Sequence, residues 1–497
     1  MVSNFKAFLN CTVMNKKFYI TSAIPYVNAA PHIGHALEFV QADAIARYHA
    51  LLDEDVLYLT GSDENALKNV QAAEKAGKPV QEFVNENADR FEELLKKLNV
   101  RVDIFQRGSD QKTHFMSSQK LWDLCNHDIY QKEYTGLYCV GFVTFYERVE
   151  LDVNVECFEH PGKKLEEVSE MNYFFKLSTY QDQLRKLISS DELKIVPETR
   201  KNEMLSFLKQ PLQDISISRS DERAKNWGVP VPGDDSQRMY VWFDALNIYQ
   251  SGIGFGADEE KYNTWWPADV HVIGKGITRF HAIYWPAFLI SAKLPLPKEL
   301  FVHGYITVDG QKMSKSIGNV VDPFEMIEKY GVDALRYYLL REIPSHGDGD
   351  FSERRFKELY NADLANGLGN LVARVAKLAE KANVSLSHSR EGGNLKRSPI
   401  GVGDDIEQYH LLFKEYKLNE VLEFVWKTIS GLDKKINESK PWELEGEALK
   451  KSIKPLAESM YELGYLLTPF LPQTAEKILK QFSGNIQSST PLFPRLQ

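Results

Sequence analysis

The chain has 497 residues, of which 43% are hydrophobic and 26% are charged, the composition of an ordinary globular protein. At about 150 residues per domain, this length predicts roughly three domains. A net charge of −9 excludes nucleic-acid binding through overall charge, so any such partner needs a local basic surface. Four cysteines form no disulfide framework and indicate a reducing, cytoplasmic location. No apolar run is long enough for a membrane span, so no membrane association is expected.

The N-terminal part alternates short apolar runs with amphipathic stretches. The strands predicted here are 18–21, 56–59 and 102–105, and the helices are 34–52, 65–76 and 80–98. This alternation indicates a parallel sheet with crossover helices. Residues 1–13 are expected to be an irregular extension before Met14.

The pattern changes near Cys125, because residues 130–175 are rich in strands and turns and contain no long helix. The α/β pattern resumes near Ile215, with predicted strands at 240–243, 270–273 and 301–306. An insertion into one α/β domain is the simplest account. From Asp322 onward nearly everything is predicted to be helical, apart from a loop rich in glycine at 385–405.

The sharpest motif is Pro31-His32-Ile33-Gly34-His35, which follows the first predicted strand and begins a helix. Backbone N–H groups at a helix N-terminus attract anions, and two imidazoles add donors that can reach a phosphate. Gly34 leaves room for a flat base against the backbone. The motif predicts a triphosphate site without a Walker loop. An incidental helix start is the alternative, and zinc is less favoured because no third ligand lies at suitable spacing.

A second motif is Lys312-Met313-Ser314-Lys315-Ser316, which lies between two glycines. Two lysines on a short Ser-rich loop can close over a polyphosphate. Taken alone, this pentapeptide is more typical of a solvated lysine turn.

Together, and in this order, the two motifs resemble the paired HIGH and KMSKS signatures of class I aminoacyl-tRNA synthetases. Small nucleotidylyltransferases also carry HxGH, but they are far shorter and lack a helical C-terminal third. From about residue 16 to residue 480, further segments resemble methionyl-tRNA synthetases.

The resemblance implies a methionine pocket in which Asp63 holds the substrate ammonium. The implied lining is Ala23, Ile24, Tyr26, Asp63, Trp242, Ala245, Leu246, Tyr249, Ile277, His281 and Trp285. Aromatic groups suit the apolar, polarisable thioether, each contact giving roughly 0.3–1.5 kcal/mol. Taken singly, Trp242 and Trp285 are more typical of a core.

The resemblance also implies the residues that handle ATP, which are His32, Gly34, His35, Glu38, Gly274 and Lys315. His32 and His35 are implied to hold the α- and β-phosphates, and Lys315 with Lys312 the pyrophosphate, with Mg²⁺ sharing the charge. Arg219 is implied to lie near the opening of the active site. A carboxylate nucleophile is already ionised at pH 7, so orientation and charge stabilisation suffice for catalysis.

Three positions near the predicted site depart from the family pattern. The family commonly has His and Gly where this chain has Asn65 and Ala66, and often has Asp near the ribose where this chain has Gly276. In the inserted segment Phe142 replaces a cysteine of the family's zinc knuckle. The remaining candidates, Cys139, Cys157 and His160, make a poor site for a metal that wants four ligands, so a zinc-free knuckle is predicted.

The C-terminal helices resemble the family's anticodon-binding bundle. Asn370 and Arg374 align with its N-x-x-x-R pair, and Trp442 aligns with a tryptophan that stacks on anticodon bases. Lys377 and Lys381 follow Asn370 and Arg374 on the same side of the predicted helix. For these two lysines, a solvated face is the better interpretation. The implied partners are initiator and elongator tRNA(Met), L-methionine and ATP. The appended dimerising module of longer family members is absent, so a monomer is expected.

The expected fold class is α/β: a Rossmann-like parallel-sheet catalytic domain with an inserted connective domain, followed by an all-α anticodon-binding bundle. The expected boundaries are 14–124 and 214–304 for the two catalytic halves, 125–213 for the insertion, 305–355 for a stem-contact region with KMSKS, and 356–497 for the bundle.

Two other interpretations stay open. One is a class I synthetase for cysteine, leucine, isoleucine or valine, although no ligands for the zinc of the cysteine enzyme are visible, and the insertion is too short for the editing domain of the others. The second is a catalytically inactive RNA- or partner-binding relative, against which the intact His32, Gly34, His35 and Lys315 argue.

Overall fold

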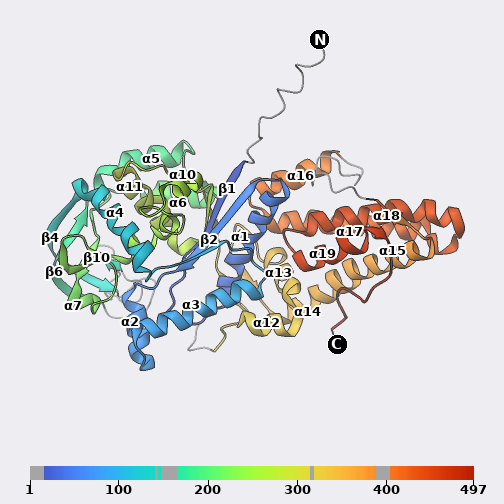
Figure 1. The fold of residues 1–497 in the computed structure, drawn as a ribbon, viewed down its shortest axis with the longest axis horizontal. Helices are drawn as coiled ribbons and strands as arrows, with labels where there is room; N and C mark the ends of the chain where they lie inside the picture. Colours follow the sequence, from blue (N-terminus) through green and yellow to red (C-terminus); the bar gives the residue numbers. More distant parts are fainter. Residues whose placement is uncertain (1–15, 140–143, 147–164, 314–317, 388–402, 497) are drawn as a thin grey trace, which may run out of the picture.

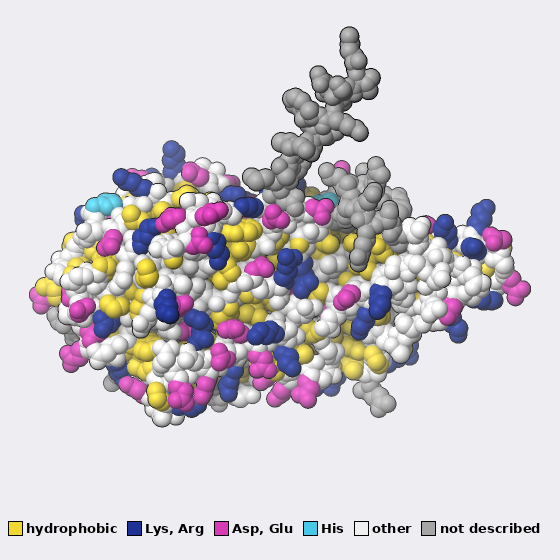
Figure 2. All heavy atoms as spheres, in the orientation of Figure 1, with side chains coloured by type: hydrophobic (Ala, Val, Ile, Leu, Met, Phe, Trp, Pro, Cys, Tyr) yellow, Lys and Arg dark blue, Asp and Glu magenta, His cyan; other side chains and the backbone are white. Residues whose placement is uncertain are grey.

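The computed structural model describes residues 16–139, 144–146, 165–313, 318–387 and 403–496. Figure 1 shows a mixed α/β part that contains the N-terminal two thirds of the chain and an elongated helical part that contains the rest. On the face drawn in Figure 2, Lys and Arg side chains are interspersed with Asp and Glu. None of the described helices combines the length and the apolar character that crossing a bilayer requires.

The central sheet has six parallel strands in the order β3-β2-β1-β12-β13-β7. These strands are β1 Lys17–Ser22, β2 Asp55–Ser62, β3 Ile104–Arg107, β7 Lys194–Val196, β12 Val270–Gly274 and β13 Glu299–His303. The middle strands are buried almost throughout, as in a parallel sheet covered on both faces. Strand order reverses between β1 and β12, and α/β folds bind ligands in the crevice outside the carboxyl ends of the strands at such a switch point.

The helices of this part are α1 Ile33–Leu51, α2 Leu67–Ala76, α3 Val80–Lys97, α4 Met116–Cys125, α8 Val241–Ala245, α9 Ile248–Ser251, α10 Glu259–Trp265 and α11 Trp285–Ser291. Helices α1, α2 and α3 confirm the predicted helices 34–52, 65–76 and 80–98, and their ends differ from the prediction by at most two residues. The predicted strand at 240–243 is wrong, since this segment forms most of α8. All five residues of α8 are buried, and periodicity cannot distinguish a short buried helix from a buried strand.

The segment predicted as an insertion is strand-rich, as expected. A four-stranded antiparallel sheet in the order β5-β4-β6-β8 contains β4 Ile129–Cys139, β5 Thr144–Tyr146, β6 Glu166–Phe175 and β8 Ile215–Ser216. Beside it lie β9 Ser218–Ser220, β10 Pro230–Val231 and β11 Asp234–Met239, with helices α5 Gln181–Ser189, α6 Glu198–Phe207 and α7 Asp221–Ala224. The three-residue strand β7 lies in the same segment but pairs with β13, so the segment also supplies an edge strand of the central sheet.

The remainder is mostly helical. Its helices are α12 Pro323–Tyr330, α13 Val332–Arg341, α14 Glu353–Leu359, a π-helical segment Tyr360–Gly369, α15 Asn370–Lys381, α16 Gly403–Lys414, α17 Leu418–Ser439, α18 Gly446–Leu467 and α19 Pro472–Gln481. Its short strands are β14 Ile306–Val308, β15 Gln311–Lys312, β16 Gly349–Phe351, β17 Ser385–Leu386 and β18 Gly484–Asn485. An apolar seam runs along residues 364–378: Leu364, Leu368, Leu371 and Val375 are buried, and Leu378 packs against this core.

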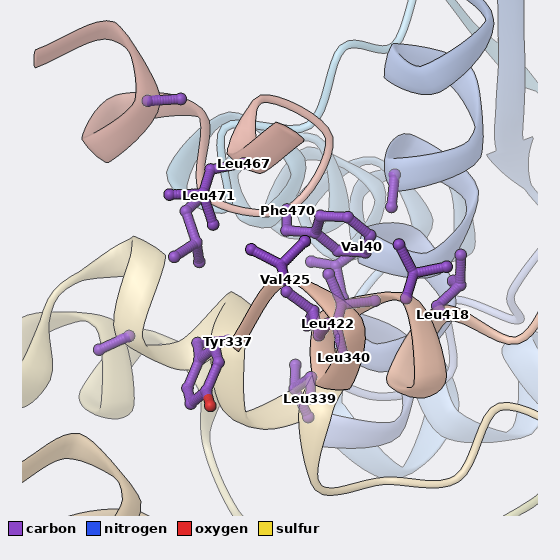
Figure 3. Close-up of a cluster of buried hydrophobic side chains, with 14 of the residues drawn as sticks. Val40, Tyr337, Leu339, Leu340, Leu418, Leu422, Val425, Leu467, Phe470 and Leu471 are labelled. Atoms are coloured by element: carbon purple, nitrogen blue, oxygen red, sulfur yellow. The ribbon is translucent and has the colours of Figure 1, made fainter. Parts of the chain in front are cut away.

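One buried cluster joins the sheet to the bundle (Figure 3). Val40 of α1 and Leu340 of α13 lie there beside Leu422 of α17 and Phe470, which follows α18. Figure 1 shows α13 between α1 and the long C-terminal helices. The helix that carries the HIGH motif therefore shares a hydrophobic core with the C-terminal part.

A buried ion pair lies within this junction. The side chains of Arg336 and Asp43 have no exposed surface, and their nearest N and O atoms are 2.6 Å apart. The Arg336 guanidinium also donates to the carbonyl oxygens of Leu98, Pro469 and Phe470 at 3.1, 3.0 and 2.8 Å. One side chain thus ties α1, the end of α3 and the α18–α19 turn to α13.

Replacing Arg336 by Met is expected to lower the free energy of unfolding by about 3 kcal/mol, because the change removes a buried partner of Asp43, leaving only Arg47 at 2.8 Å, and leaves three buried carbonyl oxygens without their donor. Urea unfolding followed by tryptophan fluorescence measures the loss. Arg354→Met is the matched control, since Arg354 pairs with Glu358 in α14 with 80% of its side chain exposed. Equal midpoints for the two variants would contradict the prediction.

Candidate active site

The HIGH motif forms a reciprocally capped helix start at the carboxyl edge of the sheet. His32 is the N-cap of α1, and its Nδ1 accepts a hydrogen bond from the Gly34 N–H at 3.1 Å. The Nδ1 of His35 accepts one from the His32 N–H, also at 3.1 Å. Because both Nδ1 atoms are acceptors, each neutral ring carries its proton on Nε2. The turn therefore presents imidazole N–H donors together with the first backbone N–H groups of α1.

The two rings lie against each other, with centroids 3.9 Å apart. Burial, and then the neighbouring His32, lower the pKa of His35 well below its usual value. His35 is therefore uncharged at neutral pH and acts as a hydrogen-bond donor. Gly34 is required here, because a Cβ at this position would lie 2.9 Å from Cε1 of His32.

The segment that carries KMSKS flanks this turn. Residues 314–317, and with them Lys315, lie outside the described residues. On either side of them the chain is fixed: the Val321 carbonyl accepts from the Ile33 N–H at 3.1 Å, and Met313 packs against the core that contains Ile33. Lys312 is exposed and pairs its backbone with the adjoining hairpin strand. Sequence positions nearly three hundred residues apart thus meet at the start of α1.

Glu38 and Gly274 lie at the same edge. The Glu38 carboxylate bonds the His303 imidazole at the end of β13, with 2.9 Å between Oε2 and Nε2. Gly274 ends β12, and a Cβ on it would lie 3.5 Å from the His303 ring. The structure therefore brings Glu38 and Gly274 together through His303, a residue that sequence analysis did not single out.

The predicted methionine-binding residues are also brought together. One buried cluster contains Ala23, Trp242, Ala245, Leu246, Tyr249 and Trp285, with Ile24, Tyr26 and Ile277 packed against it. Asp63 forms a β-bridge with Tyr26, and Tyr249 bonds His281. All eleven residues therefore belong to one buried cluster or contact its members directly.

Asp63 is a buried carboxylate at the end of β2, with 2% of its surface exposed. Its Oδ1 has no hydrogen-bond partner among the described residues. Burial, and then Asp244, raise its pKa well above the usual value. An unpaired buried carboxylate oxygen fits a cationic ligand.

Lys68 of α2 was missed by the sequence analysis. Its Nζ lies 2.8 Å from the centroid of the Tyr26 ring. Burial lowers the pKa of Lys68 to about 7, against the opposing effect of the Asp63 carboxylate. No periodicity distinguishes this lysine from those on exposed faces, so only the fold reveals it.

Hydrogen bonds fix the polar groups of the aromatic pocket. The Nδ1 of His281 lies 3.0 Å from the Ile277 carbonyl oxygen, which can only accept, so Nδ1 carries the proton. The Nε2 of His281 then accepts from the Tyr249 hydroxyl at 2.8 Å. Burial lowers the pKa of His281 to about 4, so this imidazole is uncharged at neutral pH. Phe280, also missed, stacks on Trp242 with centroids 3.8 Å apart.

Asn65 and Ala66, which replace the His and Gly common in the family, are both buried. The Asn65 side chain donates to the Gly108 carbonyl and to Oδ2 of Asp244, both at 2.7 Å. Oδ1 of Asp244 lies 2.6 Å from Nε2 of His114, and Ala66 is fully buried. Asn65 is therefore part of a buried polar network behind the pocket.

The remaining predicted positions lie farther along the chain. Arg219, on β9, is 5% exposed and lies 5.0 Å from the Tyr240 ring centroid. In the bundle, Arg374 pairs with Asp433 at 2.8 Å and lies 5.6 Å from the centroid of the Trp442 ring. Trp442 is 45% exposed, and Asn370 is exposed at the start of α15, one turn before Arg374.

The predicted zinc-free knuckle falls largely on residues 140–143 and 147–164, which lie outside the described residues, as does the side chain of Cys139. It stays a prediction. Within the described ranges, no group of three or more His, Cys, Asp and Glu side chains is arranged to hold a metal ion.

Comparison with known proteins agrees with this geometry. Residues 18–376 match the family described as tRNA synthetases class I (M). The methionine–tRNA ligase of Thermotoga maritima is 42% identical over 94% of this chain and 75% of its own length. That of Brucella suis is 39% identical over 93% of this chain and 91% of its own. A structure of Mycobacterium tuberculosis methionyl-tRNA synthetase in complex with methionyl-adenylate superposes with a TM-score of 0.87 at 37% identity, covering 97% of this chain and 100% of the other.

A HIGH turn at the switch point of a parallel sheet, followed by a helical part, defines a class I aminoacyl-tRNA synthetase. Within that class the chain belongs to the methionyl-tRNA synthetases, or methionine–tRNA ligases. The predicted family and fold class are confirmed, and the synthetases for cysteine, leucine, isoleucine and valine are set aside.

The neutral state of His281 predicts a pH-dependent stability. An unfolded histidine takes up a proton near pH 6.5, whereas folded His281 does so near pH 4. Between these two pH values the unfolded state binds more protons than the folded state. The stability that neutral His281 contributes is therefore complete above pH 6.5 and is lost as the pH falls. When the pH is lowered from 7 to 5, the free energy of unfolding of the wild type should fall by about 2 kcal/mol more than that of His281→Gln.

Urea midpoints at pH 7, 6 and 5 measure this difference. His127→Gln serves as the control, because the His127 side chain is 57% exposed. The prediction fails if His281→Gln and His127→Gln show the same dependence on pH.

Proposed function

We propose that this chain activates L-methionine with ATP to give methionyl-adenylate and transfers the methionyl group to the 3′ adenosine of tRNA(Met). The observation that carries the proposal is the common location of two groups at one sheet edge: the capped His32–His35 turn and the unpaired carboxylate oxygen of Asp63. The Mycobacterium tuberculosis relative binds methionyl-adenylate, which combines the ligands that these two groups suit.

In the activation step, a methionine carboxylate oxygen attacks the α-phosphorus of ATP, and the bond from that phosphorus to the pyrophosphate oxygen breaks. His32 and His35 donate Nε2 hydrogen bonds to the α- and β-phosphates, supported by the N–H groups that begin α1. Lys315 and Lys312 neutralise the departing pyrophosphate, and Mg²⁺ bound to the ATP phosphates would share that charge. No general base is needed, so catalysis is orientation plus charge stabilisation.

Selection of methionine follows from the chemistry of the pocket. Asp63 accepts the substrate ammonium, while the aromatic wall of Tyr26, Trp242 and Trp285 contacts the thioether. The Tyr249 hydroxyl donates to His281, so its proton is not offered to the substrate. A side chain without strong polar groups suits such a wall, because a polar one would be buried without a partner.

The helical part is the proposed site of anticodon recognition. Asn370, Arg374 and Trp442 lie on one exposed region of the domain proposed at 356–497, and Trp442 presents a ring for base stacking. The proposed catalytic halves are 14–124 and 214–304, around the insertion 125–213, with the stem-contact region at 305–355 and Arg219 near the opening. We further propose action on initiator and elongator tRNA(Met), a monomeric state, a zinc-free knuckle and a cytoplasmic location.

Amino-acid-dependent ATP–pyrophosphate exchange tests the proposed activity directly. Methionine is expected to support exchange, and cysteine, leucine, isoleucine and valine are expected to support little. The double variant His35→Ala and Lys315→Ala should lose exchange while retaining tRNA binding in a filter assay, because the bundle is untouched. If the wild type binds tRNA and exchanges with no amino acid, a catalytically inactive binding protein is the correct interpretation.

Asp63→Asn isolates the ammonium contact. The KM for methionine should rise about 10- to 100-fold, since a charged hydrogen bond contributes about 1.5–3 kcal/mol, while the KM for ATP stays within about twofold. In the wild type, methionine binding should weaken as pH is lowered, because the raised pKa of Asp63 makes this carboxylate protonate early. Asp214→Asn is the control, a carboxylate that binds Tyr130 in the connective sheet. An unchanged methionine KM in Asp63→Asn would place the ammonium elsewhere.

A further inference from the structure

Tyr305 is an aromatic residue that neither the sequence motifs nor the proposed mechanism uses. It lies between β13 and β14 at the carboxyl edge of the central sheet, with 46% of its surface exposed. Two residues before it, His303 bonds Glu38 of α1 at 2.9 Å. The residue after it, Ile306, lies 3.7 Å from the position that a Cβ on Gly34 would take. Tyr305 therefore lies between two residues that contact the first turns of α1.

The Tyr305 hydroxyl lies over the backbone at the end of β12. A Cβ on Gly276 would be 2.0 Å from the hydroxyl oxygen and 3.2 Å from Cζ of the ring. Only glycine at position 276 allows this close approach. Since β12 is the neighbour of β1, the hydroxyl is placed at the switch point of the sheet.

The surroundings hold the ring in place. Lys275 lies over it, with Nζ 4.7 Å from the centroid, and pairs with Asp348 at 2.7 Å. The other oxygen of Asp348 accepts from the Tyr305 N–H at 2.8 Å, and the Gly349 N–H donates to the Tyr305 carbonyl at 2.9 Å. The backbone on both sides of Cα is fixed, so the side chain is preorganised.

The charges around Tyr305 indicate which part of a nucleotide it meets. Lys275, the described lysine that lies over the ring, is paired with Asp348, so it is not an uncompensated cation for a phosphate. A phenolic hydroxyl both donates and accepts a hydrogen bond, which matches a sugar hydroxyl. With the phosphates at the start of α1, the ribose is the next group along the nucleotide.

We propose that the Tyr305 hydroxyl hydrogen-bonds a ribose hydroxyl of ATP and of the aminoacyl-adenylate, and that Gly276 is required to admit it. The inference rests on the proposed adenylate-forming function and assigns a binding residue to it. Tyr305 contacts the nucleotide at a distance from the reacting atoms, so it sets affinity for ATP more than the rate of the chemical step.

Methionine-dependent ATP–pyrophosphate exchange by Tyr305→Phe, with ATP, 2′-deoxy-ATP and 3′-deoxy-ATP, tests this contact. The KM for ATP should rise about fivefold, with kcat and the methionine KM within twofold. With the deoxynucleotide that lacks the bonded hydroxyl, wild type and Tyr305→Phe should have equal KM values. Tyr130→Phe is the control, since it removes a tyrosine hydroxyl that bonds Asp214 in the connective sheet.

Gly276→Ala provides an independent test that leaves Tyr305 unchanged. The added methyl group displaces the hydroxyl, so the KM for ATP should rise at least as much as in Tyr305→Phe. The double variant should be no worse than Tyr305→Phe alone, because the methyl then meets the ring carbon at 3.2 Å and a small shift relieves it.

The outcomes separate this inference from the function on which it rests. A wild type without methionine-dependent exchange overturns both. A wild type with exchange and an unchanged ATP KM in Tyr305→Phe overturns the ribose contact alone. If Tyr305→Phe raises the nucleotide KM by the same factor with all three nucleotides, the ribose contact is also overturned. Tyr305 would then contact the base or serve only the stability of the fold.

Discussion

The active site depends on how α1 begins. At the end of β1 the chain must expose helix N–H groups toward an anion, yet those groups need partners when no anion is bound. The two histidines provide these partners, because the Nδ1 atom of each ring accepts a hydrogen bond from a backbone N–H of the turn. The same two bonds direct the ring protons to Nε2. One local interaction therefore starts the helix, fixes both tautomers and makes Nε2 of each ring a hydrogen-bond donor.

The position of α1 is in turn fixed at two points along its length. Its start is held by the bond from Ile33 to Val321, which brings the flank of the KMSKS segment to the HIGH turn. Its middle is held by the buried pair of Asp43 and Arg336, which also reaches the α18–α19 turn. The helix that begins at the HIGH turn thus packs directly against the part of the protein proposed to meet the anticodon. A shift of the bundle cannot leave α1 unaffected, because packed interiors have little free volume.

Burial decides the charges of the site. His35 and His281 are kept neutral by desolvation, so Nε2 of His35 is a hydrogen-bond donor and Nε2 of His281 accepts from Tyr249. Asp63 is buried next to Asp244, which raises its pKa and makes a cationic ligand its natural partner. These states follow from the surroundings that the fold creates, since the same side chains in water would titrate near their ordinary pKa values.

The sequence by itself determined the alternation of strands and helices and the HIGH turn at the first strand end. These are local features, because period, capping and motif spacing are carried by neighbouring residues. The strand predicted at residues 240–243 is wrong, because a short helix that is buried on all sides shows no apolar periodicity. The sequence also did not identify β7 as an edge strand of the central sheet. Only the tertiary structure placed Lys68 over Tyr26, Phe280 on Trp242 and Tyr305 over Gly276. Such contacts join segments that are separate in the chain, or depend on a helix orientation set by packing, so no local pattern encodes them.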